Sequence, residues 1–280
     1  MYEQRRTPLP SPNTTKAAAR VFTRGWKRRR RTGIVRNPEL LVALPASEPP
    51  DFMIPEPETR NVRVWDLPTR IFHWLLAATV IGSVATAKFG GNAAVWHFRL
   101  GYLVLTLLAF RIVWGLVGGH WSRFANFIYT PATLLRYLRG QARAGEHLDV
   151  GHSPLGALSV FGLLVFLLLQ VATGLVTDDE ISNVGPLNRF VASATAGLAT
   201  TYHKAVGQYV LIVMILLHVG AVLYYLWAKK RNLIRPMIDG NKPLGLGVPQ
   251  ALDSLRTRSV AAAIVAVCGI AVWRLVTLGG

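Results

Sequence analysis

Four histidines lie inside or at the ends of strongly apolar segments of this 280-residue chain, namely His73, His97, His203 and His218. Moving an imidazole from water into hydrocarbon is costly, so an ionisable residue in such a segment marks a candidate functional site. Imidazole is also an axial ligand of haem iron. If the four histidines pair across antiparallel helices, they predict two sites at which a haem iron is held between two imidazoles.

The segments that carry these histidines are long enough to cross a membrane. Five apolar segments each approach the ~20 residues that a helix needs to span a bilayer, and they cover 68–88, 95–117, 154–176, 201–227 and 259–278. Only 16% of the residues are charged, whereas soluble domains have about 25%. We therefore expect an all-α integral membrane protein, with a four-helix transmembrane haem-binding bundle and a fifth, C-terminal transmembrane helix.

The formal net charge of +17 is distributed as membrane topology requires, rather than as a nucleic-acid-binding surface. Basic residues concentrate at the N-terminus and in the loops 118–152 and 228–258, whereas the loop 177–200 is acidic. Cytoplasmic loops of membrane proteins are rich in Lys and Arg. We expect a multi-pass protein of the bacterial inner (cytoplasmic) membrane with its N-terminus in the cytoplasm, and with membrane lipid rather than nucleic acid as a partner.

Composition divides the chain into three parts. Residues 1–62 are rich in Pro, Arg, Ser and Glu and are predicted to be a disordered, basic cytoplasmic extension. Residues 63–242 hold the four histidines and form the predicted haem-binding membrane domain, and 243–280 form a linker and the last transmembrane helix. The single cysteine, Cys268, excludes covalent haem attachment through Cys-x-x-Cys-His, so any haem would be bound non-covalently.

The expected topology sorts the histidines by depth. His97 and His203 begin helices on the outer side of the membrane, whereas His73 lies toward the inner side. His218 follows His203 by 15 residues, a rise of about 22 Å along a helix, so it also lies toward the inner side. The pairs of matched depth are His97 with His203 and His73 with His218. The second ring nitrogen of each ligand should donate to a carbonyl or a hydroxyl.

Glycines and arginines near the histidines are candidate haem contacts. Gly101 and Gly207 each follow a histidine by four residues, on the same helix face, where a missing side chain leaves room for a porphyrin. Ordinary helix packing is the alternative. Arg99 at the outer site, and Arg70 or Arg111 at the inner site, are suited to binding haem propionates, and extension toward lipid headgroups is the alternative.

His152 is a rival ligand for the inner site. It precedes a predicted helix start, with Ser153 as the N-cap and Pro154 at the first helical position. A hydrated imidazole at a helix mouth costs little, so we favour a position beside the inner haem or a quinone. A short amphipathic helix is expected at 131–138, at the membrane interface.

Short motifs run in order through the first four apolar segments. They are 65–74 (WDLPTRIFHW), 97–102 (HFRLGY), 110–115 (FRIVWG), 122–124 (SRF), 151–156 (GHSPLG), 173–175 (TGL), 203–218 and 231–237 (RNLIRPM). Over about residues 62–242 the chain resembles the bacterial cytochrome b561 and nickel–iron hydrogenase b-type cytochrome family. The resemblance implies two non-covalent b haems, with one ligand each from the first two helices and two from the fourth. It also implies electron exchange with quinone and with a nickel–iron hydrogenase or a c-type cytochrome.

The fourth helix departs from the family pattern in one respect. The two histidines of this helix are usually 14 residues apart in the family, whereas His203 and His218 are 15 apart. One extra residue rotates a ligand by about 100°. A single-turn π-bulge, which is common at functional sites, would absorb the rotation.

The sequence thus predicts a membrane-bound b-type cytochrome that moves single electrons between a redox partner and quinone. Two other hypotheses stay open. In the second, the protein itself acts as an oxidoreductase on superoxide or quinone, since Arg99 and Lys204 would attract an anion to the outer haem. The third hypothesis is a haem-free membrane anchor subunit.

Overall fold

The computed structural model describes residues 59–89, 91–143, 145–180 and 183–278. All but the last four residues of the predicted extension 1–62 lie outside the described residues. The described part of the chain contains five helices long and apolar enough to cross a membrane. The predicted all-α integral membrane fold is confirmed.

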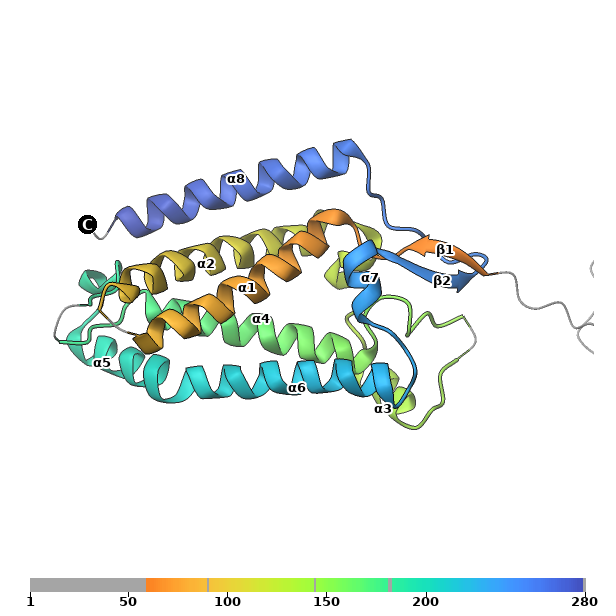
Figure 1. The fold of residues 1–280 in the computed structure, drawn as a ribbon, viewed down its shortest axis with the longest axis horizontal. Helices are drawn as coiled ribbons and strands as arrows, with labels where there is room; N and C mark the ends of the chain where they lie inside the picture. Colours follow the sequence, from red (N-terminus) through yellow and green to blue (C-terminus); the bar gives the residue numbers. More distant parts are fainter. Residues whose placement is uncertain (1–58, 90, 144, 181–182, 279–280) are drawn as a thin grey trace, which may run out of the picture. The chain divides into compact units, whose positions relative to one another are not determined.

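Four of these helices lie alongside one another as a bundle (Figure 1). They are α1 (Leu67–Phe89), α2 (Ala93–Val117), α4 (Pro154–Gly174) and the continuous helix Ser193–Trp227. The last of them comprises α5 (Ser193–Thr201), a π-helical segment η5 (Tyr202–Gly207) and α6 (Gln208–Trp227). The fifth helix, α8 (Leu255–Thr277), packs along α2 on the outside of the bundle.

Short elements gather at the end of the bundle where α1 begins and α6 ends (Figure 1). They are β1 (Thr59–Arg63), η2 (His120–Ser122), η3 (Phe124–Asn126), α3 (Pro131–Leu138), α7 (Ile234–Asp239) and β2 (Asn241–Gly245). β1 and β2 form an antiparallel pair with Val62 opposite Lys242. This pairing joins the chain before α1 to the chain after α6, and both predicted domain limits, 62/63 and 242/243, fall inside it.

Two apolar clusters hold the bundle together at different depths. Nearer the β1–β2 end, Phe72, Phe110 and Trp114 pack against Ala261 and Cys268 of α8. Toward the other end, a second cluster joins α1, α2, α4 and α6, and it consists of Val80, Val104, Leu108, Leu167 and Leu211. The two clusters set α1 and α2 in a fixed register, which places the residues around Phe72 level with those around Phe110.

Several helix limits agree with the sequence signals. α4 begins at Pro154, and Oγ of Ser153 accepts from the Gly156 amide at 3.2 Å, as expected of an N-cap. α3 covers the predicted amphipathic segment, capped by Thr130. The fourth span begins at Ser193 rather than at residue 201. The added turns are rich in Ala and Thr, so hydropathy alone does not mark them as part of the helix.

The opposite end of the bundle is closed by a loop between α4 and α5 with the 3-10 turn η4 (Asn188–Phe190). Thr200 of α5 accepts from the Asp178 amide at 3.0 Å. The loop is thereby fixed to the start of the fourth span, beside the predicted outer histidines.

Candidate haem sites in the helix bundle

The predicted outer pair is brought together by the second turn of α2 and by η5. The ring centroids of His97 and His203 are 6.0 Å apart, with an angle of 82° between the ring planes. Nδ1 of His97 lies 2.9 Å from the carbonyl oxygen of Ser83, and Nδ1 of His203 lies 2.8 Å from that of Gln170. A carbonyl only accepts, so each Nδ1 carries the proton and each Nε2 keeps its lone pair. The expectation that one ring nitrogen donates to a carbonyl or a hydroxyl is met at His97 and His203, but not at His73, whose buried Nδ1 has no partner among the described residues.

The predicted inner pair lies between α1 and α6. The ring centroids of His73 and His218 are 6.5 Å apart, with an angle of 53° between the planes. Two imidazoles that bind one iron from opposite sides, each with a metal–nitrogen distance of about 2.0 Å, have centroids roughly 6.3 Å apart. Both pairs therefore have the separation that bis-histidine ligation requires.

The π-helical segment explains how the 15-residue spacing fits two pairs. η5 contains His203 and runs from Tyr202 to Gly207. A π-turn takes up one more residue than an α-turn, so the helix beyond it keeps the register that a 14-residue spacing would have. The predicted bulge is confirmed. His218 consequently faces His73 on α1 and is not rotated away from it.

A cavity of about 420 Å³ adjoins the outer pair. Its wall comes from all four bundle helices and includes both histidines, Ser83, Gln170, Lys88 and Lys204. Gly101 also lines it, and a Cβ built there would meet no other atom within 4 Å. The space next to Gly101 is therefore open, as a flat ligand against this helix face would need.

The two other glycines near His203 behave differently. A Cβ on Gly174 would lie 2.8 Å from Cε1 of His203, so only glycine allows the ring its position. Gly174 belongs to the motif 173–175, but nothing in the motif itself indicates its contact with the imidazole. A Cβ on Gly207 would collide with Oε1 of Gln170 and with the Tyr202 ring. Gly207 thus lies at the contact between α4 and η5, and its predicted role beside a haem remains a prediction.

The inner pair is surrounded by polar groups without partners. Nδ1 of His73, Nη1 of Arg111 and Nδ1 of His152 are buried and have no hydrogen-bond partner among the described residues. Arg111 is only 3% exposed and its guanidinium lies 4.6 Å from the Phe124 ring centroid. All three atoms are donors or can become donors, so the groups that would satisfy them are acceptors.

His152 lies next to this inner pair without being one of its members. Its ring is held between Trp65 and Phe127, with centroid distances of 4.7 and 4.3 Å, and its carbonyl accepts from the Tyr129 hydroxyl at 2.8 Å. Burial, together with the charges of Arg111 and Lys242, lowers the pKa of His152 to about 3. His152 is therefore neutral and near Arg111, in the position beside the inner site that the sequence favours.

The nearest buried carboxylate is already occupied. Asp66 accepts from the Thr69 amide at 2.8 Å, from Oγ of Ser122 at 2.9 Å and from Nε1 of Trp114 at 3.3 Å. It caps the start of α1 and ties it to α2 and η2. No ion pair joins Asp66 to Arg111 among the described residues. The guanidinium of Arg111 is thus left with an incomplete set of partners.

The contacts of the other two predicted arginines are with residues outside the histidine pairs. Arg99 is exposed, lies 5.1 Å from the Trp96 ring centroid and does not line the outer cavity. Arg70 donates to the carbonyl of Ile238 and lies 3.9 Å from Asp253. Arg70 therefore fixes α7 at the end of the bundle. The predicted contact of Arg99 with a haem propionate at the outer site stays a prediction.

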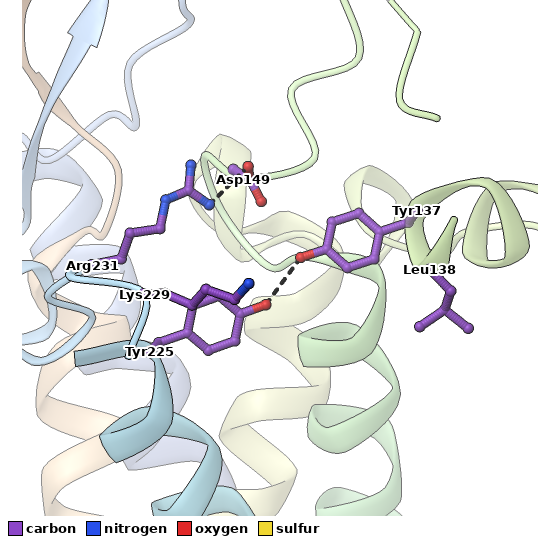
Figure 2. Close-up of a pocket in the computed structure, with 6 residues that line it drawn as sticks. All are labelled: Tyr137, Leu138, Asp149, Tyr225, Lys229 and Arg231. Carbon is purple, nitrogen blue, oxygen red and sulfur yellow. Dashed lines mark hydrogen bonds and ion pairs between the residues drawn. The ribbon is translucent and has the colours of Figure 1, made fainter. Parts of the chain in front are cut away.

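A second cavity, of about 380 Å³, lies between α3 and the end of α6 (Figure 2). Its lining residues are Tyr137, Leu138, Asp149, Tyr225, Lys229 and Arg231. The hydroxyls of Tyr137 and Tyr225 are 3.1 Å apart, and Arg231 forms an ion pair with Asp149 at 2.9 Å. No sequence signal marks this cavity, because its residues come from three separate segments.

Five membrane-crossing helices with histidines paired at two depths define a multi-pass membrane protein of redox-cofactor type. The sequence model of the family described as Prokaryotic cytochrome b561 matches residues 64–240, which is more than half of the chain. The chain therefore belongs to the prokaryotic cytochrome b561 family. It is a membrane b-type cytochrome, a haem protein of electron transport.

The curated relatives that match the chain include hydrogenase cytochrome subunits. A "Probable Ni/Fe-hydrogenase B-type cytochrome subunit" of Bradyrhizobium diazoefficiens is 24% identical over 215 residues, 65% of this chain and 86% of the relative. A protein of the same name from Cupriavidus necator is 23% identical over 63% of this chain and 85% of the relative. Another, from Rhizobium leguminosarum bv. viciae, is 22% identical over 66% of this chain and 90% of the relative. No solved structure matches the chain significantly.

Proposed function

We propose that the chain carries single electrons across the bacterial cytoplasmic membrane, between an outer redox partner and quinone, with two non-covalently bound b haems. His97 and His203 would ligate the outer haem, and His73 and His218 the inner one. The observation that carries the proposal is the separation of the two ring pairs, 6.0 and 6.5 Å. Both values are close to the roughly 6.3 Å expected for two imidazoles on one iron.

Haem supplies a one-electron couple when it is bound. Two protein ligands per iron leave no coordination position open, which favours electron transfer over reaction with oxygen. The chain's own contribution is to fix the imidazoles, to exclude water from the space between the helices and to balance the charge of the propionates. Each of these tasks falls to different residues at the two sites.

At the outer site the backbone fixes the ligands. The carbonyls of Ser83 and Gln170 hold Nδ1–H of the two histidines, which directs Nε2 into the bundle. Gly101 leaves the neighbouring helix face open. Lys88 and Lys204 line the same cavity, so we assign the outer propionates to these two lysines in place of Arg99.

At the inner site side chains supply the binding groups. The unpartnered Nη1 of Arg111 and Nδ1 of His152 would bind a propionate, since a carboxylate accepts from both and neutralises the buried guanidinium. A quinone carbonyl would accept the same hydrogen bonds but would leave the charge uncompensated. Arg111 therefore favours the haem carboxylate.

The orientation and the partners follow from charge and from the relatives. The basic loops 118–152 and 228–258 would lie in the cytoplasm, which places the inner pair near the cytoplasmic side. The extension, residues 1–62, would be cytoplasmic, and the haem domain would consist of residues 63–242. The last part, 243–280, would be a linker followed by the transmembrane helix α8. The relatives are named as nickel–iron hydrogenase subunits, which supports a hydrogenase as the electron donor. A c-type cytochrome is the second candidate donor.

A second function, reaction with superoxide at the outer site, has one observation in its favour. Lys88 and Lys204 line the outer cavity and would attract an anion. Asp179 lines the same cavity and opposes this attraction. The haem-free anchor is not favoured, because the family is one of b-type cytochromes.

Optical spectroscopy of the purified protein tests the proposal. A reduced-minus-oxidised spectrum should show a b-type signal, and the haem-to-protein ratio should be about two, one per histidine pair. Redox titration should resolve two potentials. A ratio of one would refute the second site, and a protein that contains no haem after reconstitution would refute the function.

A further inference from the structure

The second cavity lies where a membrane helix leaves the bilayer. α6 is the last part of the span that ends at Trp227, so Tyr225 is in its final turn and Lys229 and Arg231 follow directly. Tyr224 and Trp227 are 53% and 65% exposed. Exposed aromatic residues at the end of a membrane helix mark the level of the lipid headgroups. The cavity therefore opens at headgroup depth.

The charge of the cavity is positive. Arg231 is paired with Asp149, whereas Lys229 has no carboxylate partner among the described residues and lies 5.9 Å from the Tyr224 ring centroid. Lys242 does not line the cavity, and it donates to the carbonyls of Asp149 and Val150 at 3.2 and 2.7 Å, which ties it to the protein. The ammonium of Lys229 is thus the cation that remains for a ligand.

Two tyrosines line the same cavity as Lys229. Figure 2 shows Tyr137 from α3 and Tyr225 from α6 pointing toward each other across the cavity. One hydroxyl donates to the other in this contact, so one phenolic proton stays available for a third group. An ammonium and a phenol together suit a phosphate oxygen. Neither an uncharged headgroup nor a metal cation would neutralise the charge of Lys229.

The apolar surroundings point to a ligand with acyl chains. Leu138 lines the cavity and is 57% exposed, and Leu135 on the same amphipathic helix is 48% exposed. Such a helix lies in the membrane interface with its apolar side toward the acyl chains. We propose that Lys229, Tyr137 and Tyr225 bind the phosphate of an anionic phospholipid whose chains extend along α3 and α6. The site is separate from the histidine pairs and does not depend on the number of haems.

The test compares two neighbouring lysines. Lys229→Gln and Lys230→Gln remove the same charge, but only Lys229 lines the cavity. The purified full-length variants are placed in nanodiscs with a photoactivatable phosphatidylglycerol, and the labelled peptides are identified by mass spectrometry. We expect label on 131–138 and 224–231, and about tenfold weaker label in K229Q, the factor for the loss of one hydrogen bond to a charged group. K230Q and the wild type should label alike.

Competition distinguishes the sources of the phosphate. Unlabelled phosphatidylglycerol should displace the label, whereas phosphatidylcholine and inorganic phosphate should not. The double variant Y137F/Y225F should weaken the label while it retains the helix packing. Equal loss in K229Q and K230Q, displacement by phosphatidylcholine, or displacement by inorganic phosphate alone would each overturn the lipid site.

Discussion

The outer and inner histidine pairs have similar separations but differ in how their polar atoms are satisfied. At the outer pair both Nδ1 atoms donate to backbone carbonyls. At the inner pair Nδ1 of His73 is unpartnered, as are the neighbouring Nη1 of Arg111 and Nδ1 of His152, among the residues that the structure describes. Buried donors without acceptors are rare in folded proteins. The outer histidines are therefore oriented by the chain itself, whereas the inner site has buried donors that an acceptor on a bound group would satisfy.

The two sites also differ in where their geometry comes from. The outer one depends on backbone features, the π-helical segment and the close contact of Gly174 with the His203 ring. The inner one depends on long side chains that extend from α2 and from the loop before α4. Backbone geometry persists when a bound group is lost, whereas side chains that are fixed only by the bound group become mobile. The outer site should therefore be better preorganised in the haem-free protein.

Removing a ligand should give the largest effect. We expect His203→Ala to lose the outer haem and His218→Ala to lose the inner haem, because each iron then has a single axial ligand. The haem-to-protein ratio should fall from about two to about one, with a different redox potential missing in each variant. His147→Ala, in the exposed loop, is the control. If both variants lost the same potential, the pairing by depth would be wrong.

Neutralising Arg111 should act on the inner site only. We expect Arg111→Gln to weaken retention of the inner haem by about 1.5–3 kcal/mol, the range for a hydrogen bond to a charged group. Haem retention during dilution, followed at each redox potential, measures this effect. Arg99→Gln is the matched control for the inner haem, because Arg99 is exposed and is predicted to act only at the outer site. A loss of outer haem in R111Q would contradict the assignment of Arg111.

A methyl group at Gly101 should act on the outer site through volume alone. A Cβ there meets no atom of another segment within 4 Å, and alanine is a better helix former than glycine by about 1 kcal/mol, so Gly101→Ala should leave the haem-free protein at least as stable as the wild type. With haem bound, the added methyl should cost about 1–3 kcal/mol of outer-haem affinity, as overpacking does. Gly220→Ala is the control, since its surroundings are equally open. Equal haem affinities in both variants would mean that no porphyrin lies against Gly101.

The sequence was sufficient for the number of membrane spans and for which histidines lie close to one another. Hydropathy marks each membrane helix, and positive loops fix which helix ends share a side, so His97 and His203 had to be at the same level. The 15-residue spacing even indicated the π-helical segment. Because these features are local or periodic, they can be recognised in a single sequence.

Contacts between distant segments were not predictable. The β1–β2 pair, the acceptors Ser83 and Gln170 and the cavity lysine Lys88 depend on how four helices pack against one another. Arg99 illustrates the limit, because its sequence position suggests the outer site, but only the structure shows that its guanidinium lies 5.1 Å from the Trp96 ring centroid. Helical periodicity places a residue on a face, but rotation of the whole helix decides what that face contacts.

Shortening the fourth span by one residue should have the smallest effect when the residue is removed from the π-helical segment η5. Deleting Ala205 from η5 brings His203 and His218 to a 14-residue spacing and turns the π-turn into an α-turn, so both haems should be retained. Deleting Val213 from α6 gives the same spacing in a regular helix and rotates His218 by about 100°, so the inner haem should be lost. The haem-to-protein ratio distinguishes the two deletions. Because the variants share one length and one histidine spacing, any difference between them must come from the π-helical segment, and equal haem contents would show that it does not set the register of the inner pair.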